Sequence, residues 1–128
     1  MPVFSHVMVG TNDMARSKAF YDALFAAMGG KPGQEDPLGR VLYFHRGALF
    51  MISKPIDGEP ATVSNGGTIG FGVASPEEAD AWHRAGTENG GTAVEDPPGE
   101  RNGSAGRLYL AYLRDPDGNK LCALHRLG

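Results

Sequence analysis

The second half of this 128-residue chain repeats the pattern of the first half. A shift of 62 positions lays residues 6–11 on residues 68–73 and places Phe20 over Trp82. Each half reads as a strand, a helix, a pair of glycines and then two or three more strands. Such a period indicates one supersecondary unit used twice, so the fold must be one that two copies of this unit can build together.

The helices carry the clearest local signals. In the first half, Asn12 or Asp13 can cap a helix that the glycines at residues 29–30 end. In the second half, Ser75 supplies a capping hydroxyl before Pro76, so a helix should begin there and end before the second Gly-Gly pair. The apolar residues of the first helix recur at helical spacing: Met14, Phe20, Leu24 and Met28.

Strands and loops account for the rest of the chain. Residues 3–9 should form the first strand, and two hairpins should follow the helices: 40–45 with 48–53, and 107–113 with 120–125. The second hairpin turns at Asp115-Pro-Asp-Gly-Asn119. Two segments are predicted as loops: a connection between the halves over 55–67, and a mobile flap rich in Gly, Pro and charge over 95–106.

These elements predict an α+β fold. Two βαβββ repeats should form paired curved mixed sheets around a cleft, with the helices on the outer faces. Residues 1–128 are expected to be a single domain, with a first module over about 1–58 and a second over about 66–128.

Composition excludes several classes of function. The net charge is −3 and the basic residues are scattered, so the sequence contains no basic cluster that would bind nucleic acid. The apolar runs suit strands, and the N-terminus lacks the layout of a signal peptide, so no membrane partner is expected. The single cysteine, Cys122, fits a reducing compartment. We therefore expect a cytoplasmic protein with a small-molecule ligand.

The order of elements, together with three short motifs, resembles the vicinal oxygen chelate superfamily of glyoxalases, bleomycin-resistance proteins and extradiol dioxygenases. The motifs are Ser5-His-Val-Met-Val9 in the first strand, Ser17-Lys-Ala-Phe-Tyr21 on the first helix and the turn at residues 115–119, and the last two are specific in combination. The resemblance covers essentially the whole chain and implies one glyoxalase-like domain, which is often a homodimer. Packing of Phe20 and Tyr21 explains the helix motif, and formation of a turn explains residues 115–119, without any catalytic role.

The resemblance also implies four cleft positions where metal-dependent relatives hold Zn²⁺, Ni²⁺, Mn²⁺ or Fe²⁺. These positions are His6, Met51, Thr68 and Cys122. Only His6 is a standard ligand, whereas such sites need about three His or carboxylate ligands. No metal cofactor is therefore predicted, and neither Met51 nor Cys122 can replace a metal-bound carboxylate base.

Several alternatives remain open for these residues. A soft set of His6, Met51 and Cys122 would suit Cu(I), and a strand register shifted by one residue would bring His45 into a metal site. His6 could act as an acid or base without metal. Cys122 lies in mid-strand, so a buried structural thiol is favoured over a nucleophile.

Other cleft residues would set ligand preference. Arg107, beside the flap, could bind an anionic ligand such as a carboxylate or a thiol conjugate. The strand tyrosines that point inward would line the cleft: Tyr43, Tyr109 and Tyr112.

Two functions of different classes fit these features. The first is a glyoxalase-like lyase or isomerase with an atypical or metal-free site, acting on a small oxygenated metabolite or thiol conjugate. The second is a protein of the bleomycin-resistance type that sequesters a small ligand without catalysis.

Overall fold

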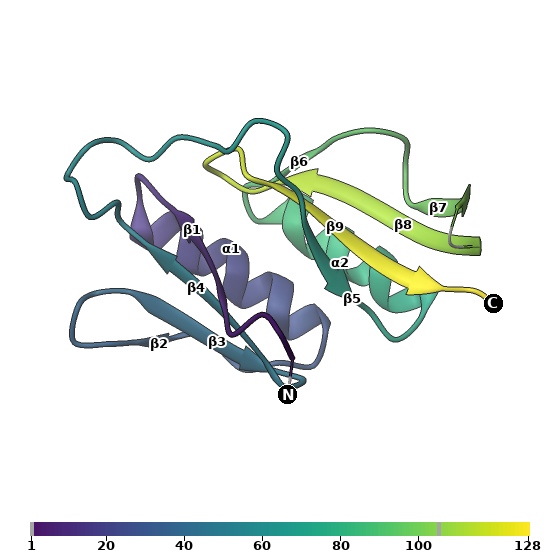
Figure 1. Cartoon of the computed structure of the whole chain (residues 1–128), viewed down its shortest axis with the longest axis horizontal. Helices are drawn as coiled ribbons and strands as arrows, with labels where there is room; N and C mark the ends of the chain where they lie inside the picture. Colours follow the sequence, from purple (N-terminus) through teal and green to yellow (C-terminus); the bar gives the residue numbers. More distant parts are fainter. Residues whose placement is uncertain (1, 105) are drawn as a thin grey trace.

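A computed structural model describes residues 2–104 and 106–128 of the chain (Figure 1). The elements follow the predicted repeat: β1 (Val7–Gly10), α1 (Met14–Ala27), β2 (Gln34–Glu35), β3 (Val41–His45), β4 (Ala48–Ser53), β5 (Ile69–Gly72), α2 (Pro76–Glu88), β6 (Thr92–Ala93), β7 (Gly99–Gly103), β8 (Gly106–Arg114) and β9 (Lys120–Arg126). Both helices begin 62 positions apart, at Met14 and Pro76, as the repeat predicts. Among the described residues, no helix is both long and apolar enough to cross a bilayer.

Each module builds its own mixed sheet. The first sheet has the order β1-β4-β3-β2, and the second has the order β5-β9-β8-β6 with β7 paired to β8. In both sheets the first strand runs parallel to the last strand, and the remaining pairs are antiparallel. Edge strands β1 and β5 face each other at the centre of the molecule (Figure 1) without joining the sheets into one. This arrangement confirms the predicted α+β fold.

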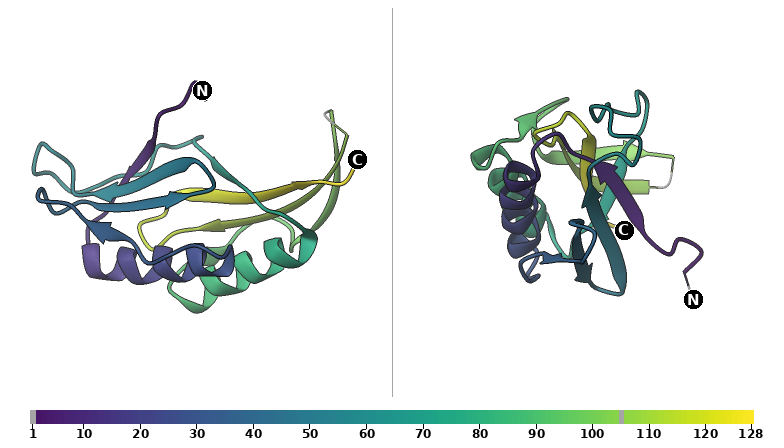
Figure 2. Two further views of the ribbon diagram at one scale, coloured as in Figure 1. Left: turned by 90° about the horizontal axis from the view of Figure 1, so that it is seen from below. Right: turned by 90° about the vertical axis from the view of Figure 1, so that its left-hand side faces the viewer.

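The helices lie together under one side of the two sheets, where they contact each other (Figure 2). Asp13 caps α1 by accepting a hydrogen bond from the Arg16 amide, and Ser75 caps α2 in the same way from Glu78. The opposite side of the sheets is open. The sheet faces toward the helices carry the core, and the open faces are where a ligand can approach.

Aromatic side chains from both modules make up much of the core. Phe20 and Tyr21 of α1 and Trp82 of α2 are fully buried. The packing is tight at Gly91, where an added Cβ would lie 2.7 Å from a Phe20 ring carbon and 2.8 Å from the Gly86 carbonyl oxygen. The second Gly-Gly pair therefore ends α2 where a strand and a helix come too close for a side chain.

One junction between the modules is centred on Asp117, in the turn between β8 and β9. Its carboxylate accepts hydrogen bonds from the hydroxyls of Thr11 and Ser17, at 2.8 and 2.9 Å, and from the Asn12 amide at 2.9 Å. Arg16 pairs with the same carboxylate at 3.0 Å. The predicted turn thus holds the start of α1 in the other module.

A second junction involves Arg46, in the turn between β3 and β4. The Arg46 guanidinium holds the Glu78 carboxylate of α2 with bonds of 2.7 and 2.9 Å. It also donates to the carbonyl oxygens of Met28 at 3.0 Å and Gly72 at 3.3 Å. Each module therefore sends the turn of its last hairpin to the helix of the other module.

Two expectations about strands were wrong. The first strand begins at Val7, and Val3 and Phe4 lie before it as an exposed arm, because pairing with β4 starts only at Val7 opposite Phe50. The segment 95–106, predicted as a loop, contains β7, which pairs with β8 through contacts such as Glu100 opposite Tyr109. Long β8 offers an unpaired edge there, and backbone hydrogen bonds overcome the weak strand preference of Gly and charged residues.

Candidate functional site

The strand register places Met51 and Cys122 at equivalent positions in the two modules. Met51 lies opposite Met8 of β1, and Cys122 lies opposite Gly70 of β5. Both side chains are buried, at 6% and 8% exposed, yet neither belongs to the main core cluster. Because neighbouring strand residues alternate between faces, both side chains belong to the open faces of their sheets.

His6 and Thr68 stand just outside the strands. Each is the residue before its strand begins, two positions ahead of Met8 and Gly70 respectively, and each is exposed. His6 was expected within the first strand and instead lies in the N-terminal arm, where its Nδ1 shares a 2.8 Å hydrogen bond with the Ser5 hydroxyl. His6 and Thr68, which the 62-position shift superposes, therefore take equivalent places before β1 and β5.

These four residues do not fit a divalent metal. They offer one imidazole, one hydroxyl, a thioether and a thiol, where a borderline or hard cation prefers imidazole and carboxylate. Burial raises the pKa of the Cys122 thiol, which disfavours the thiolate that a metal would need. Across residues 2–104 and 106–128, no three His, Cys, Asp or Glu side chains form a group that could hold a metal ion.

His45 lies on the other side of its sheet. The register pairs Leu42 with Met51 and His45 with Ala48, so alternation turns His45 toward the helices. Its Nε2 contacts the Met28 carbonyl oxygen at 2.9 Å. The shifted register that would bring His45 beside Met51 is therefore not the one adopted.

A groove runs along the open side over β1. One part, of about 740 Å³, lies between β1 and the connection that follows β4, and a second part, of about 330 Å³, continues toward the start of β5. Four residues line both parts: Met8, Val9, Gly10 and Thr62. The predicted site residue Thr68 lines the second part.

Cations are spaced along this groove. Arg40 and Lys54 line its larger part, and Lys120 lines the smaller part. Arg40 is paired with Asp36, and Lys120 is paired with Glu95. Lys54 is exposed and has no carboxylate partner within the described ranges, so its ammonium group is available to an anionic ligand.

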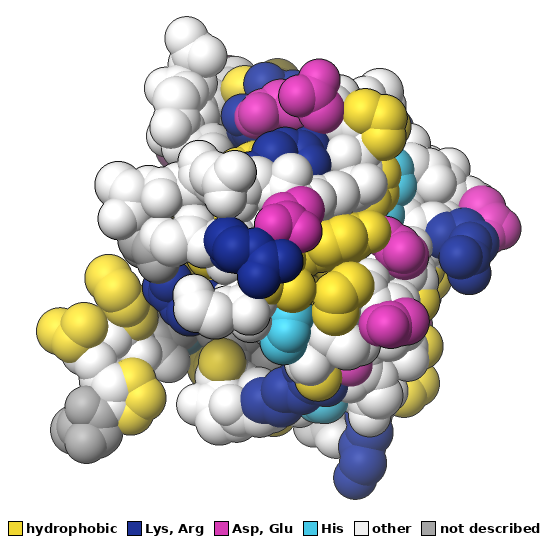
Figure 3. Space-filling view, turned by 90° about the vertical axis from the view of Figure 1, so that its right-hand side faces the viewer, with side chains coloured by type: hydrophobic (Ala, Val, Ile, Leu, Met, Phe, Trp, Pro, Cys, Tyr) yellow, Lys and Arg dark blue, Asp and Glu magenta, His cyan; other side chains and the backbone are white. Residues whose placement is uncertain are grey.

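Arg107 lies away from this groove, near the start of β8. Its Nε donates to the Glu100 carboxylate of β7 at 2.7 Å, and this contact raises the pKa of Arg107. On the face shown in Figure 3, acidic and basic side chains are interspersed. The structure thus gives the Arg107 guanidinium a partner within its own hairpin.

The strand tyrosines divide between the two faces. Tyr43 and Tyr109 point toward the helices, where their hydroxyls donate to Asp22 and Asp80, both at 2.7 Å. Tyr112 lies opposite Cys122, on the open face, and the Lys120 ammonium sits 5.1 Å from its ring centre. Only Tyr112 takes the inward position that would line the cleft.

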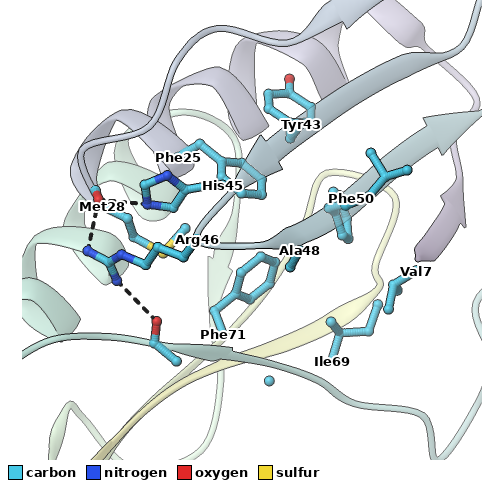
Figure 4. Close-up of a pocket in the computed structure, with 13 residues that line it drawn as sticks. Val7, Phe25, Met28, Tyr43, His45, Arg46, Ala48, Phe50, Ile69 and Phe71 are labelled. Atoms are coloured by element: carbon cyan, nitrogen blue, oxygen red, sulfur yellow. Dashed lines mark hydrogen bonds between the residues drawn. The ribbon is translucent and has the colours of Figure 1, made fainter. Parts of the chain in front are cut away.

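A pocket of about 280 Å³ lies at the seam between β1 and β5 (Figure 4). Both modules line it, with Phe25, Phe50 and Phe71 forming much of its wall. Sequence patterns did not single out these residues as a site. The alternation in Gly70-Phe71-Gly72 was the available signal, because small residues beside an aromatic one leave room at an edge strand.

The comparisons with known proteins agree with this geometry. The profile of the Glyoxalase/Bleomycin resistance protein/Dioxygenase superfamily matches residues 3–123. The chain belongs to this superfamily. Among curated proteins, none matches it significantly.

Solved structures show the same fold. A glyoxalase/bleomycin resistance protein from Albidiferax ferrireducens T118 is 57% identical, with a TM-score of 0.94, and the match covers 98% of this chain and 100% of that chain. A glyoxalase-related enzyme from Fulvimarina pelagi is 18% identical, with a TM-score of 0.72 and coverage of 98% and 89%. A lactoylglutathione lyase from Agrobacterium tumefaciens is 19% identical, with a TM-score of 0.64 and coverage of 97% and 94%. The latter two share the fold only.

Proposed function

We propose that this protein binds a small amphipathic molecule in the groove over β1 without using a divalent metal, as a sequestering protein of the bleomycin-resistance type. The observation that carries the proposal is the donor set at the four family positions. One exposed histidine, a threonine, a buried methionine and a buried cysteine replace the imidazoles and carboxylates that a metal-dependent lyase needs.

The groove supports a ligand with an apolar body and an oxygen-bearing or anionic end. Its walls include the apolar side chains of Met8, Leu38 and Ile56, which would bury an apolar ligand surface. Lys54 would meet carboxylate, phosphate or phenolate oxygens. Small oxygenated metabolites and thiol conjugates have this chemistry.

Metal-free catalysis is the second candidate, and the contact between Ser5 and His6 favours it. Because the Ser5 hydroxyl holds Nδ1 of His6, Nε2 is the nitrogen left to exchange a proton with a bound ligand. A lyase or isomerase reaction would then depend on His6 alone as acid and base.

We also propose a homodimer that works in the cytoplasm. Large apolar side chains outside the groove are exposed on the N-terminal arm and on the first module, including Val3, Phe4 and Phe44. A second copy would cover such a surface. Light scattering at several protein concentrations should give twice the chain mass, and the mass of one chain would contradict the dimer.

Elemental analysis tests the metal-independent site. Protein purified without a tag or chelator should contain far less than one metal ion per chain. Titration with Zn²⁺, Ni²⁺, Mn²⁺ or Fe²⁺ should show no tight site in either wild type or His6→Ala. Stoichiometric metal that His6→Ala loses would overturn the proposal and make a metal-dependent lyase or dioxygenase the leading function.

A fluorescent amphipathic anion, anilinonaphthalene sulfonate, tests the groove. Lys54→Ala should weaken its binding roughly tenfold, because one charge-assisted contact is lost. Lys31→Ala is the matched control, since Lys31 is an exposed lysine that does not line the groove. Equal binding by the two variants would contradict the assignment of the groove.

A further inference from the structure

The seam between β1 and β5 holds a second cavity, separate from the groove over β1. Its lining includes Val7 from β1 and Ile69 from β5, together with Ala48 and Phe50 from β4. In Figure 4, Ala48 and Phe71 approach from opposite modules. We propose that this cavity is a binding site for an uncharged molecule of one or two rings, independent of the metal-free groove.

The aromatic wall suits a ring. The ring centres of Phe25, Phe50 and Phe71 lie 5.6 to 6.0 Å apart, with interplanar angles from 44° to 78°. Aromatic rings prefer such tilted or edge-on arrangements at these separations, so another ring entering the cavity finds both faces and edges to contact. Phe71 in turn lies 5.9 Å from Trp82, which links the cavity wall to the core of the second module.

The volume sets the size of the ligand. The cavity has a volume of about 280 Å³ and opens to solvent on one side. A cavity of about 150 Å³ lined by apolar side chains holds benzene, and sites for drug-sized ligands begin at about 300 Å³. One or two rings therefore fill the cavity, whereas a large glycopeptide antibiotic or a tripeptide conjugate is too big to enter whole.

Electrostatics argue against a charged ligand. Arg46 stands at the rim, but Glu78 neutralises its guanidinium, and both terminal nitrogens also donate to backbone carbonyls. The Tyr43 hydroxyl is already bonded to Asp22. An incoming carboxylate would have to displace Glu78 or lose its water without replacement, so a neutral ring is preferred.

His45 adds no free charge to the lining. Its Nε2 already contacts the Met28 carbonyl oxygen at 2.9 Å. A neutral ring such as a phenol is therefore compatible with this lining, whereas a carboxylate would find no unpaired cation to replace its water.

Fluorine NMR with two matched ligands tests the site. Para-fluorophenol should bind, with line broadening that saturates as protein is added, and para-fluorobenzoate should bind at least tenfold more weakly. Ala48→Phe fills the cavity and should weaken phenol binding at least tenfold. Ala93→Phe is the control, because Ala93 is also an exposed strand alanine but does not line the cavity.

Wild-type protein gives a second readout that does not depend on a variant folding. Nuclear Overhauser effects should connect the ring protons of para-fluorophenol to methyl groups of Val7 and Ala48, which line this cavity and not the groove. Absence of these contacts, equal binding by a folded Ala48→Phe variant, or tighter binding of the benzoate would overturn the proposal. The metal and Lys54 experiments are unaffected by any of these results, so the two sites can fail separately.

Discussion

Tyr21 of α1 donates a 2.6 Å hydrogen bond to the buried carboxylate of Asp115, which lies 94 residues later in the turn between β8 and β9. The helix motif and the turn motif of the family resemblance are therefore hydrogen-bonding partners. Packing and turn formation explain each motif alone, but the structure shows that one motif binds the other across the junction between modules. The pKa of Tyr21 is raised well above its usual value by burial and by Asp115, so the phenol stays a donor.

Tyr21→Phe should destabilise the fold by about 1–3 kcal/mol, because Asp115 loses a buried donor while the ring packing remains. Urea unfolding monitored by circular dichroism gives the free energy. Tyr112→Phe is the control, because Tyr112 lies on the open face opposite Cys122. A cost as small as that of Tyr112→Phe would show that Asn119 and backbone donors satisfy Asp115 without the phenol.

Asp117 should make stability depend on pH. Burial by itself raises the pKa of Asp117. The hydrogen bonds that it accepts and the charge of Arg16 lower this pKa by more than burial raises it, so the folded-state pKa lies below 3.8. A depressed folded pKa means that the carboxylate stabilises the fold above about pH 4, and that this stabilisation is lost as the pH falls through the folded value.

The test compares wild type with Asp117→Asn in urea across a range of pH. The difference in unfolding free energy should be largest near about pH 7 and should shrink toward about pH 2. A difference that stays constant over this range would mean that the ionised carboxylate is not what holds the start of α1.

Gly91→Ala should cost about 1–3 kcal/mol, because the new Cβ would press on backbone oxygens as well as on Phe20. The control is Gly72→Ala, where an added Cβ meets nothing within 4 Å. Thermal unfolding of both variants should show a clear loss for the first and little change for the second. Similar losses would indicate a conformational rather than a steric requirement for glycine.

If Met51 and Cys122 occupy equivalent positions in the two sheets, substitution with standard ligands should create a metal site. The triple variant Met51→Glu, Thr68→His and Cys122→Glu would add three standard ligands to His6. Its melting temperature should rise with Zn²⁺ or Ni²⁺, by the equivalent of about 2.7 kcal/mol at a metal concentration of about a hundred times Kd. The same variant carrying His6→Ala should gain less, and no gain in the triple variant would refute the equivalence.

Local signals predicted much of the fold. The caps at Asp13 and Ser75 and the turn beginning at Asp115 each depend on a few neighbouring residues, so the sequence carries them directly. The equivalence of Met51 and Cys122 was implied by the family resemblance and not by the 62-position shift, which would lay Met51 on Leu113. The strand in residues 99–103 was missed because its stability comes from the edge of β8 and not from its own composition.

The cavity between β1 and β5 could not be predicted from the sequence, because no single element forms it. Phe25, Phe50 and Phe71 come from three elements, and each has an adequate explanation as a core residue within its own module. Only the relative placement of the two modules brings them around one space. That placement depends on polar contacts between distant turns and helices, which no local pattern shows.

The charges in those contacts also determine which modules can pair. Arg16 and Glu78 are each the third residue of their helix, yet their charges are opposite, and the turns that reach them are opposite too: Asp117 meets Arg16, and Arg46 meets Glu78. Two first modules joined in this way would set Arg46 against Arg16, and two second modules would set Asp117 against Glu78. Like charges disfavour both arrangements. The charges therefore favour pairing of a first module with a second module over pairing of two identical modules.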